Sequence, residues 1–72
     1  MKWIRRKIDG IWNYSLRVNE NLVFQIEPDY GDIYVIWIAA EGWFHPLMHI
    51  KYLSAAKGLC NEIAAIIEKY KE

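Results

Sequence analysis

The chain has 72 residues, and nine Lys and Arg balance nine Asp and Glu, so its formal net charge is zero. A zero balance argues against a strongly basic nucleic-acid coat protein and against an acidic mimic of DNA. The length predicts one domain over residues 1–72, near the small end of chains that fold alone. We therefore expect the four Trp, five Tyr and two Phe to serve first as core material.

The single cysteine, Cys60, cannot form an internal disulfide, which argues against a secreted, disulfide-built scaffold. No continuous apolar stretch with a small-residue cleavage site follows the charged start, so we expect no signal peptide. The apolar run at residues 33–40 is shorter than the roughly 20 residues that a helical membrane span needs. These observations predict a cytoplasmic protein that does not engage membranes.

A hairpin is predicted at the start of the chain. Asp9-Gly10 separates Trp3–Ile8 from Ile11–Val18, and an Asp-Gly link between two β-prone runs is a strong hairpin signal. In the second run, even-numbered apolar residues alternate with odd-numbered residues that are mostly polar. This period of two predicts that the even-numbered residues face the core.

Two further strands follow. Leu22–Glu27 alternates in the same way, and Pro28–Asp32 is a predicted turn. Residues 33–39 are apolar on both faces, which is typical of a central strand. Glu41-Gly42 forms the next turn, and the sequence leaves open whether Trp43–His45 adds a short return strand before Pro46.

From Leu53 the apolar spacing changes to three and four residues, which predicts an amphipathic helix. Ser54 is the candidate N-cap, and a close approach to the sheet would explain Gly58. The predicted fold is α+β: a small antiparallel sheet of three to four strands with one C-terminal helix packed across it (β-β-β-β-α). The predicted core side of the helix consists of Ala56, Leu59, Cys60, Ile63, Ile66, Ile67 and Tyr70.

The sequence contains no catalytic constellation that we can identify. His45 and His49 are four residues apart, but two ligands do not make a zinc site. Cys60 lies on the apolar side of the predicted helix, where a thiol is inert. We predict that the chain is not an enzyme and uses no metal or cofactor.

The sheet face opposite the helix is the more informative surface. One side of the fourth strand adds an apolar, aromatic stripe to this face, and a contiguous exposed stripe marks an interaction site. The stripe consists of either Tyr34, Ile36 and Ile38 or Ile33, Val35 and Trp37. The alternative is that residues 40–52 cover the stripe. The other residues expected on this face are Arg5, Lys7, Asn13, Ser15, Arg17, Val23 and Gln25.

The closing segment "YLSAAKGLCNEIAAIIE" resembles the last helix of many small phage and prophage proteins, which often end in Leu-x-x-Ala-Lys-x-x-Cys or Ala. Leu53, Ala56, Lys57 and Cys60 match that pattern, whereas Tyr52 stands where such proteins usually have Ser or Thr. The hairpin "GIWNYSLRV" is similar to their Gly-x-Trp strand. The resemblance implies a small non-enzymatic accessory protein, and some phage proteins of this size inhibit bacterial defence systems by binding them.

The predicted architecture is also similar to that of the arm-binding domains of integrases and of plant ethylene-response DNA-binding domains. These domains contact the major groove with basic side chains of their sheet. In this chain Arg5, Lys7, Asn13 and Arg17 would take that role, since Arg and Asn can form paired hydrogen bonds with base edges.

Two functions are therefore expected. The leading one is a protein-interaction module that binds one protein or a second copy of itself, through candidate residues Tyr34, Trp43, Phe44, Arg5 and Arg17. The alternative is a nucleic-acid-binding module that uses the basic sheet face.

Overall fold

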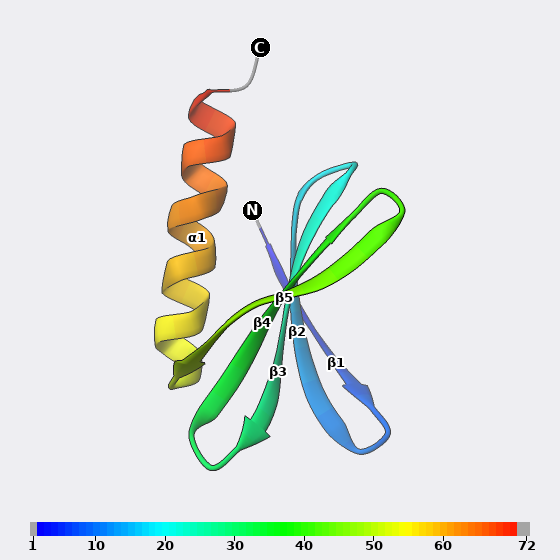
Figure 1. Cartoon of the computed structure of the whole chain (residues 1–72), viewed down its shortest axis with the longest axis vertical. Coiled ribbons are helices and arrows are strands. Elements are labelled where there is room, and N and C mark those ends of the chain that lie inside the picture. Colours follow the sequence, from blue (N-terminus) through cyan, green and yellow to red (C-terminus); the bar gives the residue numbers. More distant parts are fainter. Residues whose placement is uncertain (1, 71–72) are drawn as a thin grey trace.

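The computed structural model describes residues 2–70 and shows an antiparallel five-stranded sheet with one helix on one of its faces (Figure 1). The strands are neighbours in the sheet in the order in which they occur along the chain. The α+β class and the C-terminal helix are confirmed. The elements are β1 (Trp3–Ile8), β2 (Ile11–Asn19), β3 (Leu22–Tyr30), β4 (Ile33–Ala40), β5 (Trp43–Lys51) and α1 (Leu53–Lys69).

The sheet has one strand more than the three to four that were predicted. Residues 43–51 form β5, which pairs with β4 along its length and is an edge strand. Pro46 does not end this strand, because proline is tolerated on an edge and beside a bulge, and the pairing register shifts between Ile36 and Trp37. Residues 40–52 therefore extend the sheet and do not cover its second face.

Two-residue turns join consecutive strands. At the first turn both Asp9 (φ 51°) and Gly10 (φ 79°) have positive φ, as the type I′ hairpin turn requires. β3 continues through Pro28 to Tyr30, so the predicted turn at Pro28–Asp32 is shorter than expected. Its turn residues are Gly31 and Asp32.

The core lies between α1 and one face of the sheet. Small side chains at four-residue steps, Ala56, Cys60 and Ala64, are fully buried and form the line of the helix nearest the strands. Ile66 and Tyr70 were predicted on this side but are 57% and 75% exposed, because residues two or six positions from Ala64 do not share its face. The other side chains of the buried cluster are Leu16, Val18, Phe24, Ile26 and Ile36.

Most aromatic side chains are not fully buried, contrary to expectation. Phe24 is the buried one among them, with no exposed surface. Trp12, Trp43 and Phe44 are 40 to 50% exposed. The cluster instead has aliphatic side chains at most of its central positions. Several aromatic rings are thus available at the surface, among them Trp12, Trp43 and Phe44.

The helix begins at Leu53, preceded by Tyr52 at the N-cap position, and no side chain caps it. The predicted N-cap Ser54 lies inside the first turn. The backbone N–H of Tyr52 donates a hydrogen bond to the carbonyl oxygen of Asp32 at 2.7 Å, which ties the start of the helix to the β3–β4 turn. Within residues 2–70, no helix is both long enough and apolar enough to cross a membrane.

Gly58 does not approach the sheet, since a Cβ added there would meet no atom within 4 Å. We expect Gly58→Ala to raise the free energy of unfolding by about 1 kcal/mol, because alanine is the better helix former and the site has room for its methyl group. Urea denaturation followed by circular dichroism measures this change. Gly42→Ala is the control and should destabilise the fold, since Gly42 has a φ of 82°. A lower midpoint for Gly58→Ala would contradict the expectation.

Candidate functional site

Strand pairing assigns each side chain to one of the two faces of the sheet, because directly paired residues of antiparallel strands point to the same side. We call the side that packs against α1 the helix-covered face and the other side the open face. No element of residues 2–70 packs on the open face (Figure 1). Its side chains include Ile4, Arg6, Ile8, Ile11, Asn13, Ser15, Arg17, Val23, Gln25, Glu27, Val35, Trp37, Ala39, Phe44, Pro46 and His49.

Arg5 and Lys7 do not lie on the open face, so the predicted basic sheet face is wrong. The two-residue turn pairs Ile8 with Ile11, and Arg5 therefore pairs with Tyr14 and Lys7 with Trp12. Odd-numbered residues of β1 thus share a face with even-numbered residues of β2, which is the helix-covered face. Arg6, between them in sequence, is on the open face.

The two other residues of the predicted nucleic-acid site have structural contacts on the open face. Asn13 is 7% exposed; its side chain donates a hydrogen bond to the carbonyl oxygen of Ile11 and accepts one from Gln25. Arg17 donates hydrogen bonds to the carbonyl oxygens of Asn19 and Glu20, both at 3.3 Å, and so supports the β2–β3 turn. The structure does not bring Arg5, Lys7, Asn13 and Arg17 together.

The three aromatic residues of the predicted protein-binding site are divided between the two faces of the sheet. Tyr34 is half-buried and packs against the core cluster. Trp43 is half exposed on the same side of the sheet, where its ring meets that of His45 edge to face at 5.0 Å. Phe44, the next residue along β5, points to the open face because successive strand residues alternate.

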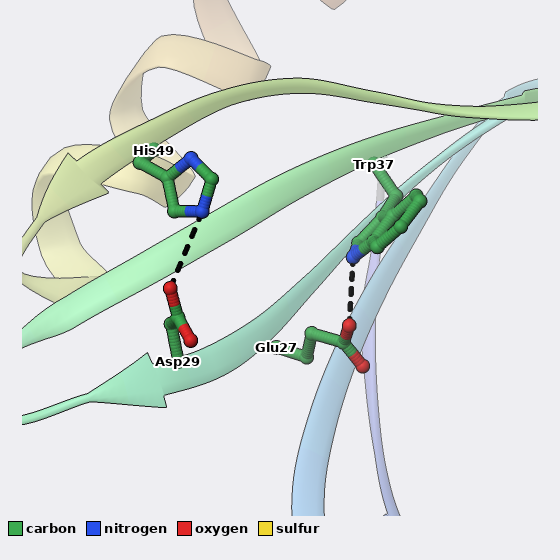
Figure 2. Close-up of polar contacts among 4 residues, drawn as sticks. All are labelled: Glu27, Asp29, Trp37 and His49. Atoms are coloured by element: carbon green, nitrogen blue, oxygen red, sulfur yellow. Dashed lines mark hydrogen bonds and ion pairs between the residues drawn. The ribbon is translucent and has the colours of Figure 1, made fainter.

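Phe44 belongs to an aromatic stack that sequence reasoning did not identify. Its ring lies parallel to that of Trp37, with a centroid distance of 4.6 Å and an interplanar angle of 1°. The indole N–H of Trp37 donates a hydrogen bond to the Glu27 carboxylate at 2.7 Å (Figure 2). This bond fixes the Trp37 ring. The Phe44 ring stacks on this fixed ring and remains 50% exposed. We call Glu27, Trp37 and Phe44 the aromatic anchor.

A second polar contact crosses the open face beside the anchor. The Asp29 carboxylate of β3 and the His49 imidazole of β5 are 3.3 Å apart (Figure 2). These strands are not neighbours, so the pair reaches over β4, whose Val35 is directly opposite His49 and is 6% exposed. Both polar contacts hold side chains of the open face in place across strands.

The residues considered for chemistry are not assembled into a reactive site. His49 is on the open face, whereas His45 pairs with Ile38 on the helix-covered face. Burial raises the pKa of the Cys60 thiol to about 11, so it is neutral at physiological pH. No group of three His, Cys, Asp or Glu side chains that could hold a metal ion occurs in residues 2–70.

Comparison of the chain with protein-family models, with curated proteins and with solved structures gives no match. The geometry of the two faces is therefore the basis for a functional proposal.

Proposed function

We propose that the chain is a non-enzymatic protein-interaction module and that the open face of its sheet binds the partner. The observation that supports this proposal is the aromatic anchor. Trp and other aromatic side chains contribute much of the binding energy at protein interfaces. A ring already fixed by stacking and by a hydrogen bond loses little conformational freedom when a partner covers it.

The rest of the open face suits a protein partner as well. Ile4, Ile8 and Ile11 on β1 and β2 are 45 to 51% exposed, and polar side chains lie between them and the anchor. Aliphatic and aromatic contacts with interspersed hydrogen-bonding groups are the composition of protein interfaces.

The resemblance of the closing helix to those of phage and prophage proteins supports a bacterial protein as the partner. On this proposal the chain acts in the bacterial cytoplasm as an accessory protein, for example as an inhibitor of a host defence protein. A second copy of the chain is the alternative occupant of the open face. Light scattering over a range of concentrations distinguishes self-association from binding to another protein.

Phe44→Ala should strongly weaken partner binding, because it removes the exposed ring of the anchor. The measurement is a pull-down of the tagged protein from bacterial lysate after nuclease treatment, with the captured protein identified by mass spectrometry and then titrated in purified form. A loss of about 2 kcal/mol, or roughly thirtyfold in Kd, is typical of such an anchor residue.

Tyr70→Ala is the matched control, since it removes another exposed aromatic side chain, 75% accessible, from the C-terminal end of α1, on the other side of the sheet. It should bind as well as the wild-type chain does. Equal capture by a correctly folded Phe44→Ala variant would show that the open face is not the binding surface.

A further inference from the structure

The helix-covered face continues beyond the helix, and there it carries a run of alternating cationic and aromatic side chains. The Arg5 guanidinium lies 4.2 Å from the ring centre of Trp12, and the Lys7 ammonium lies 5.5 Å from the same ring. Lys57 of α1 lies 4.8 Å from the ring centre of Tyr14 and 5.5 Å from that of Trp3. We call these residues the basic–aromatic strip, and its members are Trp3, Arg5, Lys7, Trp12, Tyr14 and Lys57.

The strip is continuous because of the hairpin register. Arg5 pairs with Tyr14 and Lys7 with Trp12, so cations and rings face one another across two strands. Lys57 then extends the row from the helix. At the inner end, the indole N–H of Trp3 donates a hydrogen bond to the Asn61 side chain at 3.1 Å, which joins β1 to α1. With a rise of about 3.3 Å per residue, Trp3 to Lys7 spans roughly 13 Å.

The positive charge of the strip is not neutralised by neighbouring acids. Within residues 2–70, no carboxylate lies within 4 Å of the charged groups of Arg5, Lys7 or Lys57. The contact between Asp29 and His49 is on the open face, away from the strip. Three unpaired cations close together produce a positive local potential even though the whole chain has no net charge. This surface therefore favours an anionic ligand.

We propose that the basic–aromatic strip binds single-stranded nucleic acid. The cations would contact successive phosphates, and a base would stack on the Trp12 ring, which is 40% exposed. Proteins that bind single-stranded nucleic acid combine positive charge with aromatic rings in this way, since every base has a face that can stack on a ring. The roughly 13 Å length suits two to three nucleotides.

Two other anionic ligands fit less well. The bases of a duplex are already paired and stacked on one another, so they offer no free face on which the rings of the strip could stack. An acidic peptide would pair with the cations but would leave the rings without a partner. The strip is on the opposite side of the sheet from the aromatic anchor, so this proposal is independent of the proposed protein-binding function.

The test is a fluorescence anisotropy titration of the full chain with a labelled short oligothymidylate, with the matching duplex and an oligoglutamate peptide for comparison. We expect the single strand to bind most tightly. For three phosphate contacts the slope of log K against log salt is about −2, so affinity should fall about fifteenfold between about 50 and about 200 mM salt. Binding should also quench tryptophan fluorescence, and less so in Trp12→Phe.

Arg5→Gln and Lys7→Gln are the test variants, and Arg6→Gln is the matched control. All three remove one positive charge from β1, but the Arg6 side chain is on the other face. Each test variant should weaken binding at least fivefold and reduce the size of the salt slope by about 0.7, whereas Arg6→Gln should stay within about twofold of wild type. Lys57→Gln repeats the test from the helix if a β1 variant proves unstable.

Three results would overturn the proposal. They are no binding of the single strand at about 50 mM salt, an equal or tighter affinity for the duplex or the acidic peptide, and an effect of Arg6→Gln as large as that of Arg5→Gln. The last result would mean that net charge, not the strip, determines the affinity. None of these results affects the protein-binding proposal, which is tested by Phe44→Ala.

Discussion

Phe24→Ala is expected to lower the free energy of unfolding by about 3 to 5 kcal/mol. Phe24 has no exposed surface, is paired with Leu16 on one side and Ile38 on the other, and belongs to the cluster beneath α1. Removing its ring both loses the burial of a large side chain and leaves a cavity. A chain of this length has a total stability of about 4 to 11 kcal/mol, so this one substitution removes much or all of it.

Thermal and urea denaturation followed by circular dichroism measure the loss. Phe44→Ala is the matched control, because it deletes the same ring from a half-exposed position on the open face. We expect its unfolding free energy to stay within about 1 kcal/mol of wild type, as is usual for substitutions outside the core. If the two variants were equally stable, Phe24 would not be at the centre of the core.

The order of the first four strands, the hairpin turn and the closing helix could be predicted from sequence, because each has a strong local signal. The face of β1 could not be assigned from its own residues, since its charged and apolar side chains do not alternate cleanly. The missing information was nevertheless present in the turn. A two-residue loop pairs Ile8 with Ile11 and so places Arg5 opposite Tyr14, because loop length fixes the register of a hairpin.

The fifth strand was left open for a different reason. Pro46 is a strong local break signal, but whether a proline ends a strand depends on its place in the sheet, and edge position is a tertiary property. The choice of core residues on the helix also depended on tertiary contacts. Ala64 is buried and Ile66 is exposed, although isoleucine is the more apolar side chain, because the sheet contacts only one line of the helix.

The candidate sites were predicted in part. Phe44 was identified as a candidate for partner binding, and the structure places it on the open face. Its partner Trp37 was predicted only as a member of one of two alternative apolar stripes of the fourth strand. The stacking of Phe44 on Trp37 could not be predicted, because the pairing of residues 43–51 with β4 was left open. The residues of the basic–aromatic strip were predicted in two separate groups, the cations of β1 on the basic sheet face and the aromatic rings in the core. Lys57 comes from the helix, and its place beside these residues depends on how the helix packs on the sheet.

Cys60 should add to the loss of stability of the protein at alkaline pH. Burial raises the pKa of its thiol from an ordinary value of 9.0 to about 11, because the charged thiolate is poorly solvated in the core. Above pH 9 the unfolded chain loses this proton while the folded chain keeps it. The folded state then binds more protons than the unfolded state does, so stability decreases as pH rises. Two pKa units correspond to about 2.7 kcal/mol, lost between about pH 9 and pH 11.

Urea denaturation of the wild-type chain and of Cys60→Ala across this pH range isolates the contribution of the thiol. Lysine and tyrosine side chains titrate in both proteins, so only the difference between the two curves reports on Cys60. At neutral pH the variant should be slightly less stable, because the smaller side chain leaves space beside Ala56 and Ala64. As pH rises the difference should shrink and then reverse, since alanine has no proton to lose. Parallel curves would mean that the thiol is accessible to water, and the native protein would then also react readily with a thiol reagent at mildly alkaline pH.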